Sequence, residues 1–161
     1  MSIAIRRARP DEAELILSFI RELADYEKLS HEVEATEAMI SEALFVANPR
    51  LFCEIAEWNG EAAGFAVWFA NFSTFSGRHG IYLEDLFVRP AYRGKGLGKA
   101  LLVRLAAICV ENGWSRLQWA VLDWNTPSVE FYKSLGAVMM DDWTLCRVTG
   151  PALQRLAGQG A

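Results

Sequence analysis

Cysteine and histidine are scarce in this sequence. The 161 residues include three cysteines, Cys53, Cys109 and Cys146, and two histidines, His31 and His79. An odd number of widely spaced cysteines argues against a disulfide framework and favours a reducing compartment, so we expect a cytoplasmic protein. Because the histidines have no ligand-like spacing to any cysteine, we expect no zinc site and assign no metal ligands.

Long apolar runs are missing as well. No window approaches the roughly 18 consecutive apolar residues that a membrane-spanning helix needs. The N-terminus, MSIAIRRARPDEAE, turns acidic before an apolar signal region could form. We therefore expect neither a membrane span nor a secretory signal, and no membrane among the partners.

The sequence also lacks an excess of positive charge. Its formal net charge is −4, so nucleic acid is not an expected partner. The charge is uneven, because 11–42 and 54–61 are rich in acid whereas 86–104 carries only basic charges. Opposite local fields on a small chain indicate one or more ligands that carry both signs.

What the sequence does contain fits one soluble domain. Apolar residues make up 52% and charged residues 22% of the chain, and the length suits a single hydrophobic core. We expect the core of this domain to span about 3–149. The tail, 150–161, is expected to be a short helix or disordered.

Apolar periodicity predicts an alternation of strands and helices. Strands are expected at 2–8, 51–58, 61–69, 81–88, 117–122, 138–140 and 145–148. Helices are expected at 11–26, 36–44, 97–113 and 126–135. Asn59-Gly60 is a strong hairpin signal between two β-rich runs, and Asp11 and Thr126 are the predicted N-caps of the first and last of these helices.

The order of the elements predicts an α/β fold with a mixed sheet. Two strand–helix–strand units, 81–122 and 117–140, require right-handed crossovers and some parallel pairing, whereas the front half is antiparallel. We therefore expect a twisted, mixed sheet of six to seven strands with helices on both of its faces.

A basic, glycine-rich turn follows the strand at 81–88. Its sequence, R-G-K-G-L-G from Arg93 to Gly98, opens a helix. Glycines let backbone amides approach an anion, and a helix N-terminus adds unpaired N–H groups and a positive dipole. The turn therefore predicts a diphosphate cradle, although a plain strand–helix turn on a basic surface has the same pattern. It is neither a P-loop, which needs G-x-x-x-x-G-K-[ST], nor a G-x-G-x-x-G dinucleotide fingerprint.

Several linked motifs resemble the GNAT acetyltransferase superfamily. The turn matches its acetyl-CoA motif, R/Q-x-x-G-x-G/A. The segments E-L-A-D-Y-E, Y-L-E-D-L-F-V, A-V-L-D-W-N and F-Y-K-S-L-G-A look like the diamine acetyltransferases, which include the spermidine/spermine enzymes and their thialysine-acetylating relatives. The resemblance runs from Ile5 to about Val148. It implies a GNAT-like fold, acetyl-CoA as the acetyl donor, a small primary amine as the acceptor, and a homodimer.

The resemblance also assigns residues to the cofactor. Leu86, Phe87 and Val88 would lie along the pantetheine arm, with Leu86 and Val88 contributing backbone groups. The turn residues would hold the diphosphate: Arg93, Gly94, Lys95, Gly96, Leu97, Gly98 and Lys99. Asn125, Ser128 and Tyr132 would contact the cofactor from the following helix, although ordinary helix capping explains Asn125 equally well and explains Ser128 better.

Two residues are candidates for proton transfer. Glu84 and Asp85 are adjacent in an apolar strand, so their side chains point to opposite faces and at least one should be desolvated. The resemblance places Glu84 at the carboxylate that deprotonates the amine, directly or through water; the alternative is a structural acid paired with Arg89. It places Tyr132 where a phenol gives its proton to the departing thiolate, and the alternative there is a tyrosine that packs on the sheet.

The resemblance also assigns residues to the amine end of the site. The resemblance implies Tyr26, Glu27, Asp85 and Trp119 beside Glu84, which suits a cationic substrate. Surface roles account for Tyr26 and Glu27 on sequence alone. The expected loop 71–80, NFSTFSGRHG, lacks the aspartate and tryptophan of the polyamine enzymes, which argues against long polyamines.

Four functions are compatible with these features. The leading one is an acetyl-CoA-dependent N-acetyltransferase that acts on a diamine, thialysine or a lysine-like amine. A non-catalytic acyl-CoA-binding regulatory module would keep the turn but would not need Glu84 or Tyr132. An acetyltransferase for a protein or peptide amine, or a nucleotide-phosphate enzyme that uses the same turn, completes the alternatives.

Overall fold

The computed structural model describes residues 1–159. The chain divides into two compact units, Met1–Leu122 and a second unit that begins at Asp123. No helix in the described part of the chain is long and apolar enough to cross a membrane.

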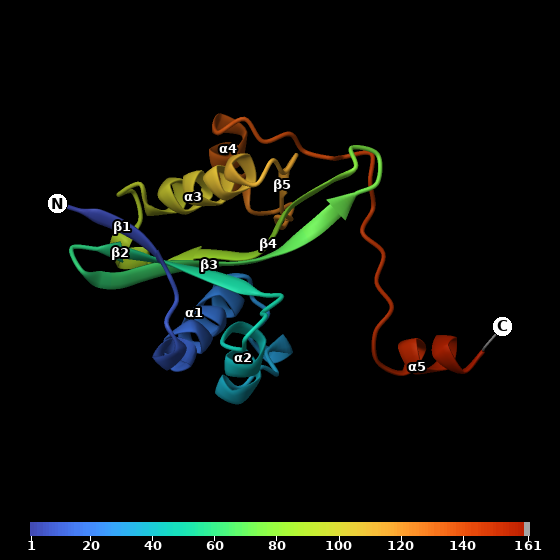
Figure 1. Ribbon diagram of the computed structural model, residues 1–161. Helices are drawn as coiled ribbons and strands as arrows, with labels where there is room; N and C mark the ends of the chain where they lie inside the picture. Colours follow the sequence, from blue (N-terminus) through green and yellow to red (C-terminus); the bar gives the residue numbers. More distant parts are fainter. Residues whose placement is uncertain (160–161) are drawn as a thin grey trace. The chain divides into compact units, whose positions relative to one another are not determined.

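The first unit is built on a single mixed sheet of five strands (Figure 1). The strands are β1 (Ile3–Arg7), β2 (Phe52–Trp58), β3 (Glu61–Ser73), β4 (Arg78–Val88) and β5 (Leu117–Gln118), in the spatial order β1-β2-β3-β4-β5. The first three pairings are antiparallel, and β5 joins β4 in parallel at Ile81 and Tyr82. The mixed α/β class predicted from the sequence is confirmed, with fewer strands than expected.

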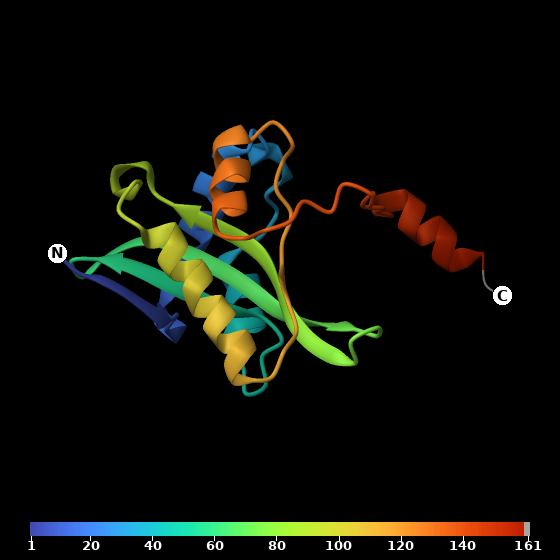
Figure 2. The same ribbon diagram turned by 90° about the horizontal axis from the view of Figure 1, so that it is seen from above.

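Helices cover both faces of this sheet (Figures 1 and 2). The helices α1 (Ala13–Tyr26) and α2 (Glu37–Leu44) lie on one face, and α3 (Leu97–Glu111) crosses the other. Three short 3-10 turns join them: η1 (Pro10–Glu12), η2 (Ser30–Glu32) and η3 (Pro90–Tyr92). The parallel β4–α3–β5 connection is the crossover that the sequence predicted.

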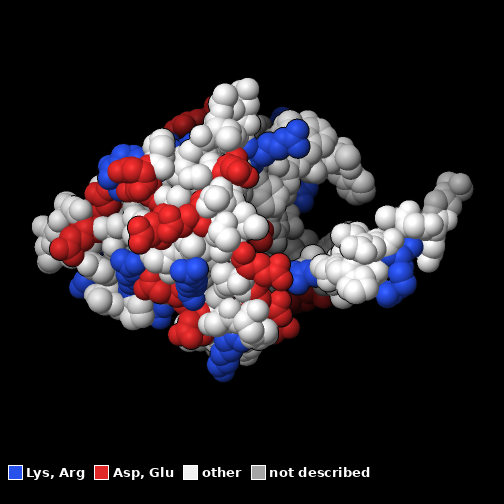
Figure 3. Space-filling view, turned by 90° about the horizontal axis from the view of Figure 1, so that it is seen from below, with Lys and Arg blue, Asp and Glu red and all other residues white. Residues whose placement is uncertain are grey.

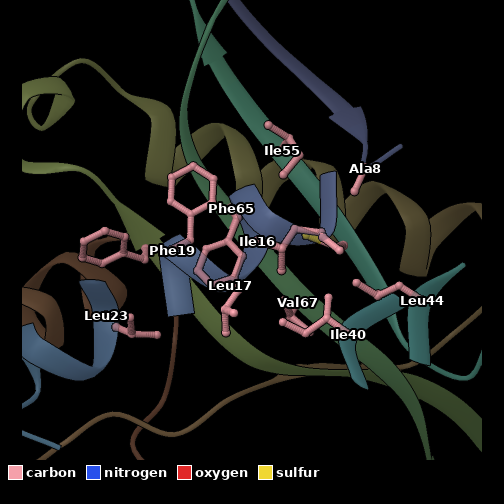
Figure 4. Close-up of a cluster of buried hydrophobic side chains, with 13 residues drawn as sticks. Ala8, Ile16, Leu17, Phe19, Leu23, Ile40, Leu44, Ile55, Phe65 and Val67 are labelled. Carbon is pink, nitrogen blue, oxygen red and sulfur yellow. The ribbon is translucent and has the colours of Figure 1, made fainter. Parts of the chain in front are cut away.

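Apolar side chains pack between the sheet and the helices on each side. Under α1 and α2, the rings of Phe19 and Phe65 stack with centroids 5.1 Å apart, next to Ile55 and Val67 (Figure 4). On the other face, α3 buries the leucines of its i, i+4, i+8 row: Leu97, Leu101 and Leu105. The start of α3 is therefore anchored to the sheet by Leu97, the residue that follows the last left-handed glycine of the turn.

The second unit contains α4 (Thr126–Ser134) and α5 (Gly150–Gly158). The final hairpin predicted at 138–140 and 145–148 is wrong, because neither run forms a strand. The strand predicted at 117–122 is likewise reduced to two residues. Strand-forming side chains do not make a strand unless a neighbouring strand supplies the ladder.

The segment 71–80 also differs from the predicted loop. The strands β3 and β4 continue through it as a hairpin, with Phe72 paired to His79 and Ser73 to Arg78. The ring of Phe72 meets the imidazole of His79 edge-on, with centroids 4.9 Å apart. Aromatic cross-strand pairs stabilise a ladder, so the two ends of this segment are extended and only 74–77 remain as a turn.

Both predicted N-caps move by one residue. At α1, the Arg9 N–H donates to Glu12 Oε2 over 2.7 Å, and Arg6 binds the same carboxylate at 2.6 and 2.9 Å. Glu12, not Asp11, is therefore the N-cap of α1. At α4, Asn125 is the N-cap in place of Thr126, because the Val129 N–H donates to the Asn125 carbonyl over 3.0 Å.

Candidate active site

The strand β4 carries a β-bulge at the first predicted catalytic residue. Val67 pairs with Asp85 and Trp68 pairs with Leu83, so Glu84 has no residue opposite it on β3. A bulge adds one residue to a strand and redirects the side chains beside it, and such bulges are common next to active sites. Glu84 is exposed in consequence, whereas Asp85 on its C-terminal side is half-buried.

Asp85 is the desolvated member of the acid pair. Its partner Val67 lies in the core under α1 and α2, so the Asp85 side chain faces that helix layer. Burial, followed by the charges of Glu84 and Glu27, raises the pKa of Asp85 from 3.8 to about 7. A carboxyl group with this pKa exists in both protonation states at neutral pH and is suited to proton transfer.

Glu27 brings a second acid to the same side of the sheet. It caps the C-terminus of α1, where its N–H donates to the Leu23 carbonyl over 2.9 Å. Burial raises the pKa of Glu27 as well. Because Glu27 also contributes to the shift at Asp85, the two carboxyl groups share one electrostatic environment although they are 58 residues apart in sequence.

Arg89 pairs with α1 rather than with Glu84. Its guanidinium donates to both carboxylate oxygens of Glu22 at 3.0–3.1 Å and to Ser18 Oγ at 3.2 Å. It also lies 4.5 Å from the centroid of the Phe19 ring. The structural alternative for Glu84, an ion pair with Arg89, is therefore not formed, and Arg89 ties the end of β4 to α1.

The glycine turn leads from η3 into α3. Gly94 and Gly96 have φ values of 76° and 88°, in the left-handed region that glycine adopts without strain. The first helical bond runs from the Ala100 N–H to the Gly96 carbonyl over 2.9 Å. The N–H groups of Leu97, Gly98 and Lys99 thus precede the helical ladder, and no side chain in the described residues caps this helix.

These features suit a diphosphate. Free amides at a helix N-terminus attract anions, and the macrodipole adds to that attraction. The basic side chains Arg93, Lys95 and Lys99 are all exposed around the turn. The residues present therefore fit the diphosphate of acetyl-CoA, which supplies an activated acetyl thioester when bound.

Arg93 connects the turn to Tyr26, one of the residues predicted to bind the amine. Its Nε donates to the Val88 carbonyl over 2.9 Å. The same guanidinium lies 5.0 Å from the Tyr26 ring centroid and 5.5 Å from that of Phe87. The structure thus brings the end of α1, the end of β4 and the turn together around one cation, a grouping that sequence spacing could not reveal.

The other strand residues assigned to the cofactor differ in exposure. Phe87 is buried in the core under α1, while Leu86 and Val88 are half-buried. Trp119, assigned to the amine end, is half-buried and follows β5 by one residue. Among the described residues, no group of three or more His, Cys, Asp and Glu side chains could hold a metal ion.

The second unit holds the remaining assigned residues. Asn125 and Tyr132 are buried and Ser128 is half-buried, all at or within α4. The ring of Tyr132 lies 5.6 Å from that of Phe131, and its carbonyl accepts the N–H groups of Leu135 and Ala137 as α4 ends. Their assignment to the cofactor rests on the resemblance of 120–137.

Comparison with known proteins matches the fold and the motifs. The model of the acetyltransferase (GNAT) family matches residues 16–137. A thialysine N-epsilon-acetyltransferase of Sus scrofa is 38% identical over 169 aligned positions, which cover 98% of this chain and 99% of the relative. An L-ornithine N5-acetyltransferase of Arabidopsis thaliana is 30% identical over 197 positions, which cover 94% of this chain and 86% of the relative.

Solved structures show the same architecture. An integron cassette protein from V. cholerae has a TM-score of 0.79 at 29% identity, with 98% of each chain covered. An aminoglycoside acetyltransferase from an uncultured soil metagenomic sample has a TM-score of 0.76 at 15% identity, covering 91% of this chain and 95% of that one. At 15% identity, the match to the aminoglycoside acetyltransferase shows only a shared fold.

The fold and the family match together define the class: the chain belongs to the GNAT acetyltransferase family. It is an N-acetyltransferase, as its near full-length relatives are. The resemblance seen in the sequence is thereby confirmed at the level of family, fold and enzyme class.

Proposed function

We propose that the protein transfers the acetyl group of acetyl-CoA to a primary amine of a small molecule. The amine is a diamine, thialysine or a lysine-like amine. The observation that carries this proposal is the glycine turn, whose exposed basic side chains and helix start, uncapped by any side chain of residues 1–159, fit a diphosphate. The strand that leads into this turn bears the half-buried carboxyl group of Asp85, whose pKa is raised to about 7, so an acid–base group and an anion cradle occupy one continuous segment of chain.

The charge distribution supports a cationic acceptor. Acidic side chains, including Glu14, Asp25, Glu34, Glu37 and Glu42, are exposed on the helix layer that also carries Glu27. Figure 3 shows acidic and basic side chains interspersed over this side of the molecule. Local acidity near Glu27 and Asp85 raises the concentration of an ammonium substrate beside them.

For the donor, we assign the binding groups that the first unit offers. The backbone of Leu86–Val88 lines the strand side, and the amides of the turn with Arg93, Lys95 and Lys99 hold the diphosphate. The Val88 carbonyl accepts from Arg93 Nε and has a second lone pair that can accept from the pantetheine arm. In the second unit, taken by itself, we propose Asn125, Ser128 and Tyr132 as further cofactor-binding residues, and this proposal rests on the resemblance of 120–137.

For the amine, we propose that the Glu84–Asp85 pair removes its proton. Glu84 is exposed at the bulge and accessible to substrate or to a bridging water, and Asp85 has the pKa that matches neutral pH. Tyr26, Glu27 and Trp119 would bind the rest of the acceptor. Tyr132 is proposed to hold the proton that the departing thiolate needs, at its phenol oxygen.

The proposal is tested by free-thiol release from acetyl-CoA with a panel of amines. We expect turnover with thialysine, lysine or short diamines. We also expect Glu84→Gln, Asp85→Asn and Tyr132→Phe each to lower kcat about a hundredfold or more. Glu27→Gln should raise KM for the amine. Its matched control is Asp25→Asn, which removes an exposed acid from the end of α1.

Two outcomes would contradict the proposal. Tight binding of CoA without turnover on any amine would indicate a regulatory acyl-CoA-binding module. Turnover on a peptide amine, with none on the free amines, would indicate a protein or peptide acetyltransferase.

We further propose that the active protein is a cytoplasmic homodimer whose residues 3–149 form one N-acetyltransferase domain. Several large apolar side chains of the second unit are strongly exposed: Val138, Met140, Trp143 and Leu145, at 60–78%. Contiguous exposed apolar patches commonly mark an interface, and these four side chains all come from the short segment 138–145. The three cysteines are free thiols, which supports a reducing compartment.

A further inference from the structure

The glycine turn rests against the hairpin between β2 and β3 through two side-chain contacts. The Tyr92 hydroxyl donates to Glu61 Oε2 over 2.7 Å. The Lys95 ammonium lies 5.3 Å from the centroid of the Trp58 ring. These two contacts flank Gly94, so the hairpin holds the turn on both sides of its first left-handed glycine.

The hairpin is a firm support for this purpose. Trp58 and Glu61 face each other in the β2–β3 ladder across the Asn59-Gly60 turn. Asn59 also exchanges two hydrogen bonds of 2.9 Å with Ser2, one from its backbone N–H and one to its side-chain oxygen. The hairpin is thereby tied to β1 as well as to its own two strands.

The turn itself needs an external support. Glycine loses more backbone freedom on ordering than any other residue, and Gly94 and Gly96 both sit between Arg93 and the first buried residue of α3, Leu97. Amides that bind an anion tightly must already be aimed before it arrives, because ordering them on binding weakens affinity. The two hairpin contacts provide that order in the free protein.

We propose that Trp58 and Glu61 are positioning residues for the acyl donor, which hold the diphosphate-binding turn in its receptive conformation. This inference rests on the proposed function, in which acetyl-CoA occupies the turn. Glu61 is otherwise an odd neighbour for an anion site, since its charge repels phosphate. Its hydrogen bond from Tyr92 gives the residue a role that offsets this repulsion.

Paired substitutions of Glu61 separate the hydrogen bond from the charge. Glu61→Gln keeps an acceptor for Tyr92 and removes the negative charge, so CoA should bind as tightly as to the wild type or more tightly. Glu61→Ala and Tyr92→Phe both lose the bond, so we expect the Kd for CoA to rise about three- to tenfold. Trp58→Leu, which removes the ring under Lys95, should raise it by a similar factor.

The measurement is isothermal titration calorimetry with CoA, with Glu111→Ala, an exposed acid at the far end of α3, as the matched control. In kinetics, KM for acetyl-CoA should rise in the bond-deleting variants while kcat and KM for the amine stay unchanged. A general loss of folding would change all three.

Equal CoA affinities for Glu61→Ala and Glu61→Gln would overturn the inference and leave the proposed function standing. A wild-type protein that binds no CoA would remove the proposed function, and this inference with it.

Discussion

At the scale of single residues, the two neighbouring acids of β4 are treated differently by the fold. The sequence predicts that Glu84 and Asp85 point to opposite faces and that one is desolvated. It does not predict which one, because the bulge at Glu84 depends on the register between β3 and β4. Asp85 faces the helix layer and has the pKa near 7, so it enters the proton-transfer proposal beside Glu84.

The pH dependence of kcat/KM tests this assignment. The rate should rise with pH through about 7, because Asp85 accepts a proton only when it is ionised. Glu84→Gln and Glu27→Gln should each move the inflection of the residual activity to lower pH, since each removes a negative charge that raises the pKa of Asp85. An inflection that stays near pH 7 in Asp85→Asn would assign it to another group.

Asp85 should also reduce stability at neutral pH. Its folded pKa lies above its unfolded value, so its favourable contribution is complete below about pH 4 and is lost as the pH rises through about 7. We expect Asp85→Asn to be more stable than the wild type by on the order of 2 kcal/mol at pH 8 and to lose this advantage at pH 4. Thermal melts at both pH values measure the difference in stability between the variant and the wild type. A difference that does not depend on pH would contradict this prediction.

At the scale of elements, the start of α3 is proposed to bind an anion, whereas its end is an ordinary helix terminus. Gly96 and Gly113 have φ values of 88° and 68°, and an added Cβ would meet no atom closer than 3.7 Å at either position. An alanine at either glycine should therefore cost stability mainly through its left-handed backbone, about 1–2 kcal/mol. Only Gly96→Ala should weaken CoA binding, because only that residue precedes the anion-binding amides.

Urea titrations and CoA calorimetry on both variants check this prediction. A matching loss of CoA affinity in Gly113→Ala would show that α3 transmits any backbone change to the turn. The site would then depend on the whole helix rather than on its first turn.

The position of α3 also depends on an acid that the sequence did not single out. Glu54 of β2 is fully buried. Its Oε2 accepts from Arg7 at 2.7 Å and from Trp68 at 3.2 Å, while Arg104 of α3 lies 3.5 Å from Oε1. One carboxylate therefore joins β1, β2, β3 and α3, and its charge is balanced by two arginines that are each 41–48% exposed.

Because the carboxylate is buried and the arginines are not, removing the arginines should cost more stability than neutralising Glu54. Arg7→Ala with Arg104→Ala leaves a buried charge without compensation and should cost about 3 kcal/mol. Glu54→Gln leaves only arginines that water can reach, so it should cost about 1 kcal/mol. Chemical denaturation compares the two, and an equal or larger loss in Glu54→Gln would contradict this account.

At the scale of the whole molecule, the exposed apolar side chains of the second unit are the main feature that one chain leaves unexplained. Two runs with strand-forming composition, 138–140 and 145–148, are outside the sheet. If a second copy covers them, the mass in solution should be twice the 18.0 kDa of one chain.

Light scattering after gel filtration measures this mass. Trp143→Asp with Leu145→Asp should give the monomer, because each charge enters the proposed apolar interface. Val110→Asp, at an 80% exposed valine on α3, should leave the dimer intact. A wild-type monomer would contradict the homodimer.

The sequence by itself determined the class of fold, the strand–helix order up to α4, the Asn59-Gly60 hairpin and the glycine turn. These depend on local periodicity and on residues, such as glycine, whose backbone preferences act over a few positions. Only the tertiary structure decided the bulge at Glu84, the electrostatic influence of Glu27 on Asp85, the Arg93 contacts and the contacts of the turn with Trp58 and Glu61. Each of these joins segments far apart in the chain, and their register and packing follow from the whole core rather than from any one stretch of sequence.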